Sequence, residues 1–339
     1  MTQSNQNAIS PKNTTASSRN DKVGAFAAVL LSGMVIAAFV GYYLVVGEES
    51  RKKNSLQLII AVFRQGDRSP LKWETYPNDM YPPMSEGTWP DGLGQLTNAG
   101  KLKSYEFGRR FRNRYTKFLP FTDKYSFISV HSTDTDRAEM TASAFLAGAF
   151  PPAGKQIWNS DLLWIPIPIY SISPDKDDQR NHMTLPSWVK VKNYMSLMED
   201  IVLEWSITYS KTDQMKKFRS GKLIGEIVRT MRDKMDERLD PNKKIFAYFS
   251  HEQTLIDFLH TLGMKNLFKP SYGAAAFVEL HKIRGEHYVK ILYTKSYDTP
   301  DLLSLDMESQ TSFLPTLEDF IIKTENYIPK NWDKECQLK

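Results

Sequence analysis

Three short apolar runs along the chain each end in a polar turn. They cover residues 56–63, 125–130 and 245–249. A short apolar run that is bounded by turn residues is typical of a strand buried on both faces of a sheet. Two further strands are expected near 274–280 and 288–293. The pattern therefore predicts a buried central sheet.

Apolar residues at helical spacing follow the predicted strands. We expect helices over 98–115, with Thr97 as the N-cap, over 138–150, after Glu252, and within the tail 316–339. Strands that alternate with helices in this way predict an α/β fold.

Residues 151–242 depart from this alternation. Pro166 and Pro168 interrupt the chain, and apolar residues then recur at every third or fourth position in two stripes. The stripes consist of Trp188, Val191, Met195, Met198, Val202 and Trp205, and of Ile224, Ile227, Met231 and Met235. We expect a helical insertion in which these side chains form a core rather than a cofactor site.

The N-terminal part of the chain divides into three segments. Residues 1–22 are rich in Ser, Thr, Asn and Gln, which predicts a disordered tail. Residues 23–46 form an uncharged apolar run that is long enough to cross a bilayer as a helix. A linker over 47–55 follows. The run predicts an uncleaved transmembrane signal anchor, with a cleaved signal peptide and a buried core helix as the alternatives.

The composition is that of an ordinary globular protein. The chain has 339 residues, of which 41% are hydrophobic and 24% charged, and its net charge is +5. No basic run interleaved with aromatic residues points to nucleic acid. The single cysteine, Cys336, excludes an internal disulfide. Asp134 and Asp136 alone are weak evidence for a metal, so we expect neither a metal nor a cofactor.

The turn after the first apolar run carries the most specific chemistry. It reads Arg64-Gln65-Gly66-Asp67-Arg68-Ser69-Pro70. Two arginines on one loop can converge on a single anion through forked, charge-assisted hydrogen bonds. In α/β folds, ligands bind at the carboxyl ends of the strands, where this turn lies. The turn therefore predicts an anion-binding site.

This turn resembles the active-site signature Arg-His-Gly-x-Arg-x-Pro of the histidine acid phosphatases at every fixed position but one. The family's histidine nucleophile is replaced by Gln65. The phrase over 89–97 and the pair His251-Glu252, where the family has His-Asp, extend the resemblance. It covers about residues 56–330 and implies a mixed, mainly parallel sheet flanked by helices. The insertion, about 155–242, would be the family's helical cap, and 331–339 would be a tail.

The resemblance also implies a role for each site residue. Arg64, Arg68 and His251 would hold the phosphoryl oxygens. Glu252 stands at the position of the acid that protonates the leaving alcohol, and its extra methylene displaces the carboxyl group. His131 replaces an arginine of the family's phosphate cage, and we count it as a candidate phosphate ligand, with a strand-end polar residue as the alternative.

The orientation of the predicted anchor follows from the resemblance rather than from charge. Three basic residues precede the span and three follow it, so the positive-inside count is a tie. Domains of this family usually face the lumen or the outside, which implies a single-pass type II membrane protein. The lack of an Asn-x-Ser/Thr sequon after the span points weakly the other way.

Three hypotheses for function remain. The first is a pseudophosphatase that binds a phosphate-containing or other anionic ligand, or a protein partner, because the carboxamide of Gln65 cannot act as a nucleophile. The second is an active phosphomonoester hydrolase in which Glu252 activates water, with His131 or His251 assisting. The third is a structural or protein-interaction ectodomain. A homodimer is compatible with each of them.

Overall fold

The computed structural model describes residues 55–74, 88–119, 125–172, 203–264, 269–299, 302–305 and 314–335. The chain divides into two units, Met1–Asn54 and Ser55–Lys339, and all the described residues lie in the second. The expected tail, membrane anchor and most of the linker lie outside the described residues. In the ranges that the structure covers, every helix is too short or too polar to span a bilayer.

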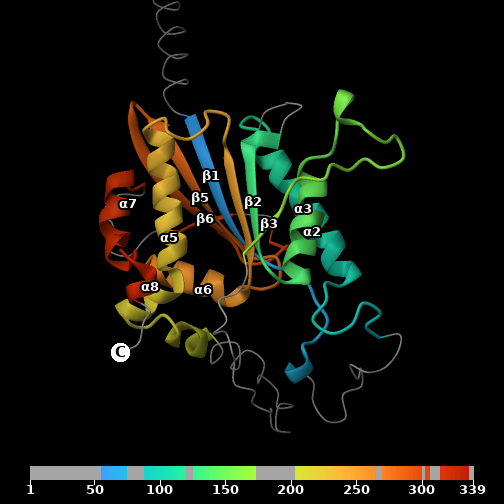
Figure 1. Cartoon of the computed structure of the whole chain (residues 1–339), viewed down its shortest axis with the longest axis horizontal. Coiled ribbons are helices and arrows are strands. Elements are labelled where there is room, and N and C mark those ends of the chain that lie inside the picture. The colour runs from blue at the N-terminus through green and yellow to red at the C-terminus, as the bar shows by residue number, and fades with distance from the viewer. Residues whose placement is uncertain are drawn as a thin grey trace, which may run out of the picture. The chain divides into compact units, whose positions relative to one another are not determined.

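A sheet of seven strands forms the centre of the described unit, in the order β3-β2-β4-β1-β5-β6-β7 (Figure 1). The strands are β1 Ser55–Arg64, β2 Ile128–Thr133, β3 Tyr170–Ile172, β4 Ile245–Ser250, β5 Ala275–Ile283, β6 Glu286–Thr294 and β7 Leu303–Leu305. The neighbours from β3 to β1 are parallel, and those from β1 to β7 are antiparallel. The mixed sheet is thus confirmed, but it is not mainly parallel, because β5, β6 and β7 follow one another as a meander.

Helices cover both faces of the sheet, as the alternation predicts. Figure 1 shows α2 and α3 on one side and α5, α6 and α7 on the other. The helices are α2 Asn98–Arg114, α3 Asp136–Ala149, α5 Asp213–Met235, α6 Glu252–Thr261, α7 Leu317–Thr324 and α8 Trp332–Glu335, and the short 3₁₀ turns are Lys72–Glu74, Tyr125–Phe127, Gly154–Gln156 and Glu325–Tyr327. Thr97 is the N-cap of α2, and its hydroxyl accepts from the Gly100 amide at 3.1 Å. The expected cap is therefore confirmed.

Alternate residues of β1 supply two separate hydrophobic cores. One core contains side chains from α2 and α3, and the other contains side chains from α5, α6 and α7. To the first core β1 contributes Ile59, Ala61 and Phe63, and to the second Leu58, Ile60 and Val62. Because both faces of β1 are buried, the strand is apolar at successive positions instead of alternating with polar residues.

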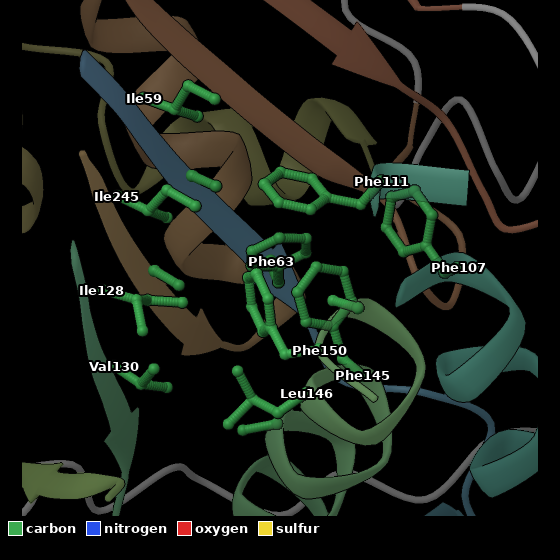
Figure 2. Packing of buried hydrophobic residues seen from close by; sticks show 14 of the residues in the cluster. Ile59, Phe63, Phe107, Phe111, Ile128, Val130, Phe145, Leu146, Phe150 and Ile245 are labelled. Atoms are coloured by element: carbon green, nitrogen blue, oxygen red, sulfur yellow. The ribbon is translucent and has the colours of Figure 1, made fainter. Parts of the chain in front are cut away.

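The core under α2 and α3 is rich in aromatic rings (Figure 2). Phe63 lies at its centre and stacks on Phe249 of β4 with ring centroids 4.6 Å apart. It also meets Phe145 of α3 at 4.8 Å, Phe277 of β5 at 5.7 Å and Phe107 of α2 at 5.9 Å. Phe63 therefore joins two neighbouring strands to both helices, directly before the Arg64 turn.

The helices α2 and α3 approach each other closely at two glycines. A Cβ atom on Gly108 would collide with the backbone of Phe145, and one on Gly148 would collide with the backbone of Tyr105. The two glycines, one on each helix, thus allow contact between the backbones of α2 and α3.

The expected helical cap over about 155–242 is described only in part. Residues 173–202 lie outside the described residues, and this stretch of the cap stays a prediction. Within the same interval, α5 packs on the sheet: Ile224, Ile227 and Met231 are fully buried in the core that β1 shares. This part of the interval belongs to the helical layer of the sheet, because its apolar stripe faces β1 and α6.

Candidate anion-binding site

The candidate site lies where β1, β2 and β4 end. These three strands are parallel neighbours, and in their register Arg64 lies opposite Ser250. The amide of Gln65 donates to the carbonyl of Ser250 at 3.0 Å, which fixes the turn after β1 against the turn after β4. Residues some 190 positions apart are thereby brought together at one edge of the sheet.

Gln65 is buried and bonded to His251. The residue is only 4% exposed. Its Oε1 accepts a hydrogen bond from Nδ1 of His251 at 3.0 Å. On the other side of the ring, Nε2 of His251 lies 3.2 Å from the hydroxyl of Thr133. Both ring nitrogens of His251 are therefore engaged, and because the carbonyl of Gln65 can only accept, the proton of the neutral ring lies on Nδ1.

The backbone under Gln65 is tightly packed. The amide of Gly66 donates to the hydroxyl of Thr141 in α3 at 3.0 Å. A Cβ atom on Gly66 would lie 2.6 Å from the hydroxyl of Tyr297 and 3.0 Å from that of Ser104. A side chain at this position would have to push buried neighbours aside, which gives the glycine of the signature a local steric reason.

Arg64 is buried and paired with Glu252. Its Nη2 lies 2.7 Å from the carboxylate of Glu252, and its Nη1 donates to the carbonyl of Pro270. The ring of Tyr272 lies under the guanidinium, 4.2 Å from it. Burial lowers the pKa of Arg64, and the negative charge of Glu252 partly offsets this.

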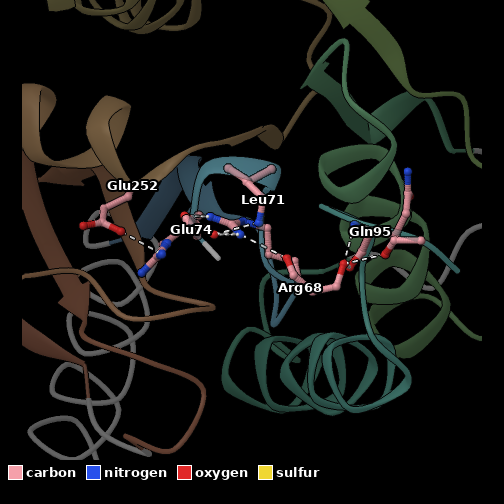
Figure 3. A network of polar contacts seen from close by, with 8 residues as sticks. Arg68, Leu71, Glu74, Gln95 and Glu252 are labelled. Atoms are coloured by element: carbon pink, nitrogen blue, oxygen red, sulfur yellow. Dashed lines mark hydrogen bonds and ion pairs between the residues drawn. The ribbon is translucent and has the colours of Figure 1, made fainter. Parts of the chain in front are cut away.

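Arg68 is paired with Glu74 in a two-pronged contact, which Figure 3 shows with Leu71 beside it. The two N–O distances are 2.6 and 2.7 Å, and Glu74 also accepts from the Leu71 amide at 2.8 Å. Burial alone would lower the pKa of Arg68, but the bond to Glu74 raises it. Burial would raise the pKa of Glu74, yet the same bond holds it below its usual range.

The two site arginines are thus both occupied by carboxylates of the chain. Each of them nevertheless keeps one buried donor, its Nε–H, without a hydrogen-bond partner in the described part of the chain. Buried donors of this kind are rare in folded proteins. These two N–H groups and the side-chain NH₂ group of Gln65 are candidate donors to an anion.

His131 is not brought together with the other predicted site residues. Its Nε2 lies 3.1 Å from the hydroxyl of Ser129, and its ring stacks on Tyr248 at 5.3 Å and contacts Tyr170 at 5.7 Å. Burial lowers its pKa. In the described parts of the chain, none of its hydrogen bonds or ring contacts reaches Arg64, Gln65 or His251.

The sequence did not indicate three of the groups that complete the site. They are Thr133 at the end of β2, Glu74 in the 3₁₀ turn Lys72–Glu74, and Tyr272, which lies shortly before β5. Of the three, only Thr133 has a signal in the sequence, its position at the end of a predicted strand. In the ranges that the structure describes, no group of three or more His, Cys, Asp or Glu side chains could hold a metal ion.

The sequence is similar to that of proteins in a known family. A family model described as "Histidine phosphatase superfamily (branch 2)" matches residues 51–190 and 186–294. Human prostatic acid phosphatase is 30% identical over 349 residues, which cover 83% of this chain and 88% of the relative. Human lysosomal acid phosphatase is 26% identical over 369 residues, which cover 90% of this chain and 85% of the relative.

Solved structures with the same fold include two enzymes at low identity. A Hafnia alvei phytase in complex with myo-inositol hexakis sulphate is 14% identical, with a TM-score of 0.54 over 85% of this chain and 99% of its own. A Bifidobacterium longum multiple inositol polyphosphate phosphatase in complex with phosphate is 10% identical, with a TM-score of 0.51 over 83% and 94%. These two likenesses concern the fold. The family model spans well over half of the sequence, and the chain therefore belongs to the histidine acid phosphatase family, branch 2 of the histidine phosphatase superfamily.

Proposed function

We propose that this protein is a catalytically inactive or strongly impaired member of its family that binds a phosphate-containing or other anionic ligand without hydrolysing it. The observation that carries the proposal is the state of Gln65, which is buried at the end of β1 and bonded to His251. Its amide nitrogen has its lone pair delocalised into the carbonyl and is no nucleophile. Removing a nucleophile typically lowers turnover by orders of magnitude.

The remaining groups support binding rather than chemistry. With its Oε1 turned to His251, Gln65 offers only its NH₂ group, which is a donor. The Nε–H groups of Arg64 and Arg68 are donors as well. A site with several donors and no nucleophile can hold an oxyanion but cannot form a covalent phosphoryl intermediate.

The first test is turnover by the full-length chain. We expect no release of phosphate from para-nitrophenyl phosphate above the buffer background, from acid to neutral pH. Human prostatic acid phosphatase serves as the active reference in the same assay. Efficient turnover that is lost in a Glu252→Ala variant would refute the proposal and establish a mechanism in which Glu252 activates water.

We also propose that residues 23–46 anchor the protein in a membrane as a single-pass type II protein, with the family domain on the lumenal or extracellular side. The length and lack of charge of this run support the proposal. The full-length chain should stay in the membrane pellet after an alkaline carbonate wash, and a protease added to intact vesicles should leave the domain uncut. Release of the full-length chain by the wash would overturn the anchor.

A further inference from the structure

We propose that the carboxylate of Glu252 is an internal ligand of the anion site, which occupies Arg64 in the free protein and must be displaced before a phosphate or sulfate group can bind. The inference rests on the proposed function, since it takes the site as one that binds anions. It assigns Glu252 the role of a competitor, in place of the proton donor that its position in the signature suggests.

Both outer nitrogens of Arg64 have a partner within the chain. Nη2 is engaged by Glu252 at 2.7 Å and Nη1 by the carbonyl of Pro270, while Nε has no hydrogen-bond partner among the described residues. The Arg64 side chain is 9% exposed and that of Glu252 is 23% exposed. Glu252 is therefore more exposed to solvent than Arg64, and an anion that takes over the Nη2 donor now used by Glu252 must replace the carboxylate.

Glu74 and Glu252 hold the two arginines with very different numbers of bonds. Both carboxylate oxygens of Glu74 accept hydrogen bonds from Arg68, and one of them also accepts from the Leu71 amide. These three hydrogen bonds hold Glu74 in place. Within the described part of the chain, Glu252 is held by one ion pair, to Arg64. Of the two carboxylates, Glu252 is therefore the one that an incoming anion displaces.

The position of Glu252 in α6 makes its displacement easier. It is the first residue of this ten-residue helix, directly after the N-cap His251. The free N–H groups at a helix N-terminus stabilise a nearby negative charge. When Glu252 leaves Arg64, its negative charge is still stabilised by the N-terminus of α6. The exchange of one anion for another therefore does not leave the carboxylate without a stabilising partner.

The chemistry of the exchange selects the class of ligand. A simple carboxylate offers two oxygens, as Glu252 does, and would gain little by replacing it. A tetrahedral oxyanion offers at least three oxygens and can also serve the NH₂ group of Gln65 and the unpartnered Nε–H of Arg64. We therefore expect phosphate or sulfate groups, free or as monoesters, to displace Glu252, whereas acetate does not.

The test is the affinity of the full-length chain for inorganic phosphate, measured by isothermal titration calorimetry. Glu252→Gln keeps the size of the side chain and removes its charge, so we expect phosphate to bind at least 10-fold more tightly than to the natural chain. Glu106→Gln removes the same charge from an exposed position on α2 and should leave the affinity unchanged. Glu252→Asp shortens the side chain and weakens the contact with Arg64, so it should give an intermediate gain even if Glu252→Gln folds poorly.

The outcomes separate this inference from the proposed function. Equal phosphate affinity in the natural chain, Glu252→Gln and Glu252→Asp would overturn the internal ligand and leave the anion-binding function standing. Failure of every folded variant to bind phosphate would overturn the anion-binding function and the inference with it. An equal gain in Glu106→Gln would show a general charge effect and would also overturn the inference.

Discussion

A Gln65→His variant will show almost no phosphatase turnover, whereas Gln65→His combined with His131→Arg will turn over on the order of 10³-fold faster than either single variant. The histidine would restore a nucleophile beside His251. Phosphoryl transfer, however, depends mainly on charges that are positioned around the transferred group, and a single well-placed arginine contributes about 10³-fold or more. The natural chain lacks such a group at position 131.

The geometry of β2 explains why His131 does not fill this place. In the alternating burial pattern of β2, His131 and Thr133 share one face. Thr133 contacts His251. His131 lies two residues before Thr133, which is about 6.5 Å further from the site along the strand. Its short ring stacks on Tyr248 instead. The longer side chain of an arginine at this position could extend toward the site.

The assay is phosphate release from para-nitrophenyl phosphate, together with trapping of an acid-labile phosphoenzyme. Gln65→Asn with His131→Arg is the matched control, since it has the added charge and no nucleophile, and it should stay inactive. If Gln65→His alone reached the rate of the double variant, position 131 would have no part in the deficit. If the double variant were inactive, the prediction would be wrong, and the histidine and the arginine together would not be enough to restore turnover.

The second large effect concerns stability. Replacing Phe63 by alanine should lower the free energy of unfolding by about 3–5 kcal/mol. The residue is 2% exposed and touches aromatic rings from α2, α3, β4 and β5. Removing its ring leaves a cavity that four separate elements border, and the fixed sheet cannot collapse into it.

Urea unfolding of the purified chain measures the loss. Phe63→Leu is the control, because it retains most of the apolar volume and should cost only about 1.5 kcal/mol. A cost below about 1 kcal/mol for Phe63→Ala would contradict the central place of this ring in the core. Since Phe63 directly precedes Arg64, the alanine variant should also weaken anion binding.

Local patterns in the sequence were sufficient for most of the fold. The apolar runs located β1, β4, β5 and β6, and Thr97 was recognised as a helix cap because its side chain acts on a residue three positions away. The sequence did not reveal the equal division of the sheet into parallel and antiparallel pairs. That division depends on which strands become neighbours, and strand order is decided by packing over the whole domain.

Several of the predicted site residues lie together, but the sequence did not indicate their pairings, and His131 lies apart from them. The signature turn located Arg64, Gln65 and Arg68, and the register of β1 with β4 brings His251 to them. That Arg64 is bonded to Glu252 depends on side-chain directions, which spacing along the chain does not specify. The stacking of His131 on Tyr248 is likewise a contact between neighbouring strands that are far apart in sequence.

Because β1 is the first strand to be synthesised and pairs with strands far along the chain, it must wait for its neighbours during translation. This strand is translated before every other element of the sheet, yet its two hydrogen-bonding neighbours, β4 and β5, emerge roughly 180 to 220 residues later. At a synthesis rate of about 5–20 residues per second, that delay is about 10–45 s. During this time a strand that will be buried on both faces has no partner strand, and its exposed apolar surface and unpaired edges make the nascent chain prone to aggregation.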